Sequence, residues 1–258
     1  MKIPLIYQID PVWYITILFI LMLVSLYTGS RVSKKRRNDI GDDNRSGVLV
    51  AGMFSLSAFI LVFTFGMSVN RYEERRHVIV TEANNIGTAV LRADLYPDSV
   101  RNLFRAEFKK YVEARIAFFE AGKDIDKIMQ TLKMSEESSS KLWQIAAGQS
   151  RIPSNLVASN QMIPALNDMI DVVMTRNIGL LSKVPPSILI MLFLLSITSS
   201  FFAGIVLRHI DWLIATGFCF LTAMVIYITL DLDQPRRGFI QLDTSQKAMY
   251  DLRKMFEQ

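Results

Sequence analysis

Four long apolar stretches constrain the fold of this chain more than any other feature of its sequence. They cover residues 12–28, 48–69, 187–207 and 212–230. Each approaches or exceeds the roughly 20 apolar residues that cross a hydrocarbon core of about 30 Å as a helix. None shows the period-two alternation of a barrel strand, so each must satisfy its own backbone groups as a helix. The sequence therefore predicts four transmembrane helices.

The spacing of these stretches predicts the domain organisation. Residues 1–69 hold the first two helices and a basic connecting loop, 70–186 form a helical extramembrane domain, 187–230 hold the other two helices, and 231–258 form a C-terminal tail. Because no strand pattern is present, we predict an all-α integral membrane fold with two pairs of transmembrane helices around a central helical domain.

Composition excludes several classes of function. The net charge is +5, but five of the basic residues lie between Arg31 and Arg37, directly after a span, which favours a membrane surface over nucleic acid. The single cysteine, Cys219, lies inside a span, and with two histidines the chain offers no zinc site of the usual kind. We find no phosphate-binding loop or nucleophile elbow. We therefore expect no catalytic residue, cofactor or metal.

The basic loop also predicts an orientation. Short loops rich in lysine and arginine stay in the cytoplasm, so we expect loop 31–47 to be cytoplasmic. An odd number of crossings separates this loop from the domain at 70–186. That domain is then predicted to be extracytoplasmic.

Helical periodicity continues past the second span. No proline interrupts the chain there, so one helix is expected to run to about Leu95. A new helix should begin after Pro97 and end at Gly122.

The rest of the central domain is also predicted to be helical. Two shorter helices are predicted at 125–134 and 135–148, with Ser135 as the cap of the second. A final helix is expected at 153–182, in which Pro164 either produces a kink or starts a new segment.

The second span carries a stripe of bulky side chains. Phe59, Phe63 and Met67 follow one another at intervals of four, so they share one face of a helix. The same helix carries hydroxyl groups at Ser55, Thr64 and Ser68. Bulky apolar residues one turn apart can form a constriction that gates a pore by excluding water. The stripe is interpreted either as the neck of a pore or as ordinary packing within the helix bundle.

Charged residues gather at the ends of two spans. They are Arg71, Glu73, Glu74 and Arg75 after the second span, and Asp231 and Asp233 after the fourth. Charges at a span's end can select ions in a vestibule, but residues three or four apart on a helix also pair with one another. Both an ion-pair network and an ion-selecting vestibule remain open for these six residues.

Several motifs resemble a known family. Residues 59–75 are similar to the neck-forming second helix of bestrophins. Over nearly the whole chain the sequence looks like the bacterial bestrophin-like membrane family, through the motifs NRYEER at 70–75, EANNIG at 82–87 and LDQPRRG at 232–238.

This resemblance implies a homo-oligomer, pentameric in bestrophins, in the inner membrane of a bacterium. Its second helices would surround a path for small inorganic ions, with anions favoured and Phe59, Phe63 and Met67 as neck positions. The expected partners are then the lipid bilayer, further copies of the chain and small ions, and not nucleic acid. Bestrophins keep their helical domain in the cytosol, which is the opposite of the orientation predicted from the basic loop.

Two other functions are compatible with the same helices. A membrane-anchored interaction or sensory module would bind a partner through the helical domain and conduct nothing. A small transporter would place charged or broken-helix sites at the midplane, whereas the third span offers only small and hydroxyl residues, which also serve helix packing.

Overall fold

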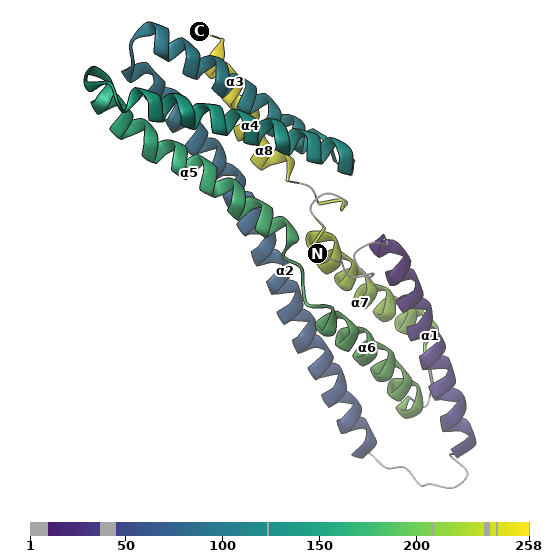
Figure 1. Cartoon of the computed structure of the whole chain (residues 1–258). Coiled ribbons are helices and arrows are strands. Elements are labelled where there is room, and N and C mark those ends of the chain that lie inside the picture. The colour runs from purple at the N-terminus through teal and green to yellow at the C-terminus, as the bar shows by residue number, and fades with distance from the viewer. Residues whose placement is uncertain are drawn as a thin grey trace. The chain divides into compact units, whose positions relative to one another are not determined.

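The computed structural model describes residues 10–36, 45–122, 124–207, 209–234, 238–240 and 242–257. Four of its helices are long and apolar enough to cross a membrane (Figure 1): α1 (Pro11–Arg36), α2 (Arg45–Arg92), α6 (Pro186–Val206) and α7 (Trp212–Leu232). No strand occurs in the described ranges. The chain is thus an all-α membrane protein with four apolar helices, which confirms the predicted fold class.

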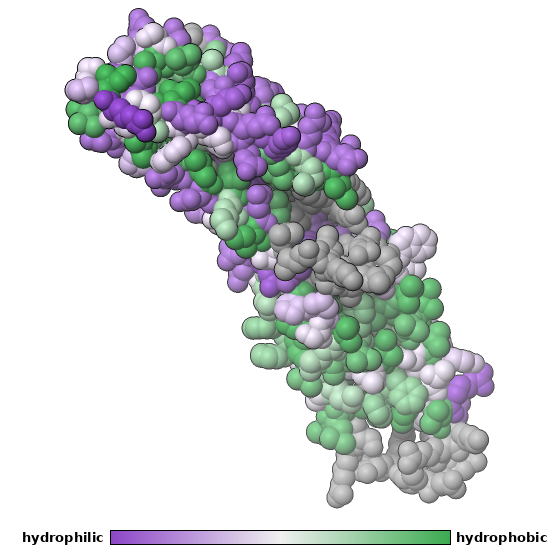
Figure 2. All heavy atoms as spheres, in the orientation of Figure 1, coloured by the Kyte–Doolittle hydropathy of each residue, from purple (hydrophilic) through white to green (hydrophobic). Residues whose placement is uncertain are grey.

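The chain forms two compact units, which we call the membrane unit (residues 1–72 and 183–234) and the helical unit (73–182 and 235–258). Figure 2 shows how their surfaces differ, since hydrophobic residues cover α1, α6 and α7, whereas hydrophilic residues dominate over α3 and α4. Residues 37–44 of the loop that suggested an orientation lie outside the described residues.

The membrane unit packs α1, α6 and α7 around a small apolar core. Leu18, Met22, Val184, Leu189, Leu192, Cys219, Ile226 and Leu230 are its buried members. Helix α2 contributes Ile60 and Leu61, which pack against this core. In the most apolar window of each of the four helices, fewer than half of the residues are buried within the single chain, as expected where lipid or a second copy covers the rest.

Two glycines allow α1 and α6 to touch through their backbones. A Cβ at Gly204 would lie 2.1 Å from the carbonyl oxygen of Leu26, and a Cβ at Gly29 would lie 2.1 Å from that of Phe201. Small residues permit this close approach, and van der Waals contact then holds the helices where no hydrophobic effect is available.

The helical unit contains the end of α2 together with α3 (Asp98–Glu120), α4 (Ile125–Gln149), α5 (Leu156–Leu181) and α8 (Asp243–Asp251). Short 3₁₀ turns lie at Ala93–Leu95, Pro153–Asn155 and Leu252–Phe256. The predicted long second helix is confirmed, and so is the stop at Gly122, whose φ of 52° belongs to the left-handed region that glycine favours.

The structure adds to or corrects the expectations for this unit at three points. Ser135 does not cap a helix, because α4 is continuous and the Ser135 hydroxyl is buried and donates to the Leu132 carbonyl at 2.8 Å. Of the two alternatives for Pro164, the start of a new segment is excluded, since Pro164 lies inside the single helix α5. The C-terminal residues are not only a tail, because α8 and the following turn bury Met249 and Leu252 in the helical unit.

Candidate functional site

The neck candidates lie on α2 within the membrane unit. Phe59 is 70% exposed and Phe63 is 59% exposed on the single chain, whereas Met67 is half-buried. Ile60 and Leu61, on another face of the helix, pack against the core of the unit. The two phenylalanines therefore form an outward apolar stripe that the protomer itself does not cover.

Two of the three hydroxyl groups named on this helix face the other way, whereas that of Ser55 is exposed. Thr64 and Ser68 are completely buried within the protomer. The Thr64 hydroxyl donates to the Ile60 carbonyl at 2.7 Å, which satisfies it inside its own helix. Because polar side chains in a membrane helix turn inward, away from lipid, these two hydroxyls lie inside the protomer and not on its outer surface.

At the end of the span, Arg71 and Asp233 come together. The Arg71 guanidinium lies 3.9 Å from the buried carboxylate of Asp233. That carboxylate also accepts the backbone N–H of Val184 at 2.8 Å, and Lys183 donates to the Asp233 carbonyl. Asp233 thereby holds the turn that leads into α6. Asp231, two residues earlier on α7, is buried as well.

The remaining charges of the NRYEER motif belong to the helical unit. Arg75 is buried and donates to the carbonyls of Gly179 (3.2 Å) and Ser182 (2.8 Å), at the C-terminal end of α5. Such a cation stabilises the negative end of a helix. Glu73 pairs with Arg76 at 3.0 Å on the surface, and Glu74 is exposed. These contacts are of the ion-pair and capping kind, while the vestibule role stays a prediction.

A buried ionic cluster joins three helices of the helical unit. The carboxylate of Glu82 accepts from Arg115 Nε at 2.5 Å and from Arg176 Nη1 at 2.6 Å, and all three side chains are buried. Both guanidiniums also lie over the ring of Phe118, at 4.9 and 5.5 Å from its centre.

The charges of this cluster follow from its surroundings. The apolar stretch of α2 ends at Val69, so Glu82 lies outside the membrane-spanning residues. Burial alone would raise the pKa of Glu82, but the guanidiniums of Arg115 and Arg176 outweigh it and lower the pKa of this carboxyl. Burial raises the pKa of the neighbouring Tyr111, which keeps its hydroxyl neutral.

Sequence reasoning missed this cluster, although α3 carries a signal for it. Phe104, Phe108, Tyr111, Arg115 and Phe118 follow one another at steps of four, three, four and three, and all five are buried. An arginine in an otherwise apolar helical stripe must find an acid inside the protein. Glu82 belongs to the EANNIG motif that carried the family resemblance.

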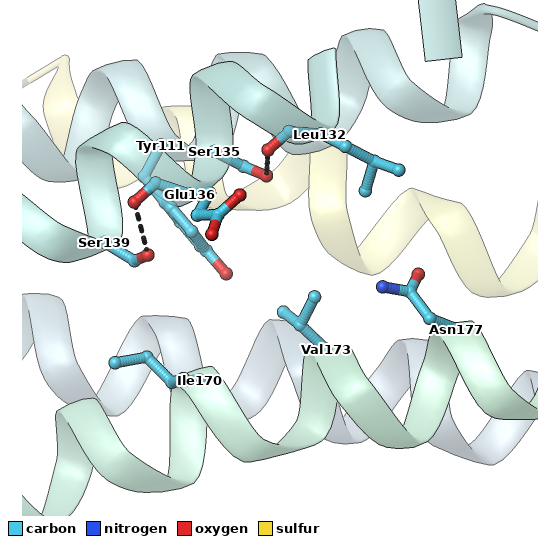
Figure 3. A pocket seen from close by; sticks show the side chains of 8 residues that line it. All are labelled: Tyr111, Leu132, Ser135, Glu136, Ser139, Ile170, Val173 and Asn177. Atoms are coloured by element: carbon cyan, nitrogen blue, oxygen red, sulfur yellow. Dashed lines mark hydrogen bonds between the residues drawn. The ribbon is translucent and has the colours of Figure 1, made fainter. Parts of the chain in front are cut away.

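The helical unit also holds a cavity of about 270 Å³ among α3, α4 and α5 (Figure 3). Its lining is Tyr111, Leu132, Ser135, Glu136, Ser139, Ile170, Val173 and Asn177. The Ser135 and Ser139 hydroxyls donate to carbonyls of their own helix. The described residues contain no group of histidine, cysteine or acidic side chains that could hold a metal ion. Both serine hydroxyls of the lining are thus engaged by their own helix.

Comparison with known proteins agrees with this architecture. The family model for the bestrophin-like domain matches residues 16–246. A crystal structure of a bacterial bestrophin homolog from Klebsiella pneumoniae, determined as a point mutant, has the same fold, with a TM-score of 0.65 over 96% of this chain and 99% of that one. The two sequences are 13% identical. The comparison with curated proteins gave no match. Since the family model covers most of its length, the chain belongs to the bestrophin-like family.

Proposed function

We propose that this protein is the subunit of a homo-oligomeric ion channel, with five copies arranged in a ring and α2 nearest the axis. Membership of the bestrophin-like family carries the proposal, because bestrophins are in general ion channels rather than enzymes. Small inorganic ions would pass, with anions favoured.

The outward stripe of α2 supports this arrangement. Phe59 and Phe63 are large, apolar and exposed on the single chain, while Thr64 and Ser68 are buried within it. In a ring, the same stripe from each copy would meet at one level and form an apolar constriction, with half-buried Met67 one turn further along. Such a constriction limits conduction by excluding water.

The contacts at the end of the span support different roles for the charged residues. Asp233 and Arg75 are buried in backbone-binding positions, so we assign them to structure. Glu73 and Glu74 are exposed and remain available to a vestibule, where they would modulate ion entry.

The subunit number is the first test. Native mass measurement or class averages of the detergent-solubilised full chain should give five copies around an axis. A monomer would contradict the proposal, because no ring of α2 helices could form. It would favour a membrane-anchored interaction module instead.

Ion flux through lipid vesicles is the second test. Vesicles that contain the protein should pass chloride, and Phe63→Ala should raise the rate because it widens the constriction. Phe220→Ala is a matched control, since Phe220 is 56% exposed on α7, close to the 59% of Phe63. Equal rates for Phe63→Ala and the unmodified protein would refute the neck assignment.

Orientation is tested with two reporters, one fused after Gln258 and one inserted near Gly122. The basic loop predicts that both lie outside the cytoplasm, and the bestrophin resemblance implies that both lie inside it. Activity of a periplasmic reporter, against that of a cytoplasmic one, decides between the two orientations in the bacterial inner membrane.

A further inference from the structure

Arg115 carries more hydrogen-bond donors than its surroundings accept. Its Nε donates to Glu82, but Nη1 and Nη2 are buried and have no hydrogen-bond partner among the described residues. Gln246, on α8, is 3% exposed, and its buried Nε2 also has no hydrogen-bond partner among the described residues. Buried donors without acceptors are rare and costly, and charged ones more so.

These donors belong to residues that line one small cavity of the helical unit. Arg115, Arg176 and Gln246 are its polar walls, and apolar parts of α3 and α8 complete it. The volume of this cavity is about 10 Å³. That is close to the room that a single buried water molecule needs. A chloride ion is only somewhat larger than water.

The charges around the cavity do not balance. The guanidiniums of Arg115 and Arg176 face the single carboxylate of Glu82, and the hydroxyl of Tyr111 stays neutral. The buried cluster therefore carries one excess positive charge. Buried charges in proteins are paired, so this cluster requires one further negative charge.

We propose that this cavity binds a small inorganic anion such as chloride, held by Nη1 and Nη2 of Arg115 and Nε2 of Gln246. A water molecule accepts two hydrogen bonds and must place two protons of its own, whereas the unpartnered groups here are all donors. An anion accepts from all of them and cancels the excess charge. It also joins α8 to the Glu82 cluster.

This site is separate from the proposed conduction path. It lies within the helical unit of one protomer, whereas the neck candidates belong to the membrane unit. The site can exist whether or not the protein conducts ions, and neither bromide binding nor thermal unfolding requires a flux measurement.

Bromide identifies the occupant directly. Crystals of the full chain grown in sodium bromide should show an anomalous peak bonded to the Nη atoms of Arg115. A structure in which Gln246 Oε1 accepts from Arg115, with no bromide in the cavity, would overturn the proposal.

Thermal unfolding tests the same site in solution. The detergent-solubilised protein should unfold about 3–6 °C higher in a halide salt at ten times its Kd than in sodium gluconate of equal ionic strength. Gln246→Glu supplies a carboxylate where the anion would bind. This variant should lose the halide response and be at least as stable in gluconate as the unmodified protein.

Gln144→Glu is the matched control, because it makes the same change at an exposed position of α4. It should keep the full halide response. If Gln246→Glu also kept that response, halide would be acting elsewhere, for instance in the pore, and the buried site would be excluded.

Discussion

Replacement of Glu82 by glutamine tests the energetics of the helical unit most directly. The change keeps the shape of the side chain and removes its charge. Arg115 and Arg176, which now lie 2.5 and 2.6 Å from the carboxylate oxygens, would then be two buried guanidiniums facing a neutral amide. The destabilisation arises from the charges that are left behind.

The expected magnitude follows from burial. Removing one partner from a buried ion pair costs about 3–5 kcal/mol. For a domain of this size, each 1 kcal/mol lowers the unfolding temperature by about 2–4 °C. Glu82→Gln should therefore unfold about 6–20 °C below the unmodified protein at neutral pH, as measured by circular dichroism or calorimetry in detergent.

The difference should also depend on pH. Because the two guanidiniums lower the pKa of Glu82 below its ordinary value of 4.5, its contribution to stability is complete above pH 4.5. That contribution is lost as the pH falls through the lower pKa of the folded state. Glu82→Gln lacks it at every pH, so the two proteins should converge in stability only in acid.

Glu113→Gln is the matched control for this experiment. Glu113 binds Arg253 at 2.6 Å, as short a contact as those of Glu82, but both side chains are 44% exposed. Exposed pairs contribute about 0–1 kcal/mol, so this variant should change little. If the two variants lost equal stability, burial would not be the cause, and the assignment of a buried charged cluster would be refuted.

Substitutions at two further positions test contacts in the membrane unit, and the measured quantity is the free energy of unfolding. Gly204→Ala places a methyl group 2.1 Å from the backbone oxygen of Leu26 and should cost about 1–3 kcal/mol, whereas Gly217→Ala, with no atom within 4 Å, should be neutral or stabilising. Equal effects would contradict the close crossing of α1 and α6. Asp233→Ala removes the acceptor of the Val184 N–H and should cost about 1–3 kcal/mol, whereas Asp233→Asn, which keeps an acceptor, should cost less.

The apolar helices could be predicted from sequence because length and hydropathy alone decide them in lipid. Nothing but a helix satisfies about 20 consecutive backbone groups in the bilayer core. The break between α5 and α6 also has a local signal, because Pro185 disfavours a helical conformation at Val184 before it. Helix boundaries within the helical unit depended on weaker signals. Ser135 is a good cap in isolation, but here it bonds its own helix.

The polar cluster could not be assembled from sequence in the same way. Glu82 lies 33 positions from Arg115 and 94 from Arg176. Only tertiary packing brings these side chains together, and no local spacing rule connects them.

Helix α8 was missed for a related reason. It has nine residues, too few for a stable isolated helix, and it depends on the apolar contacts of Met249 and of Leu252 just beyond its end.

The second helix has one face that packs within its own bundle and another that the protomer leaves uncovered. Thr64 and Ser68 are buried, with the Thr64 hydroxyl bonded to a carbonyl, so one face is committed to the protomer. Phe59 and Phe63 remain on the outside. In the proposed ring, symmetry would repeat these residues at one level in every copy. Two phenylalanines on each chain would then suffice for a closed apolar constriction, and a single substitution would change all of its walls together.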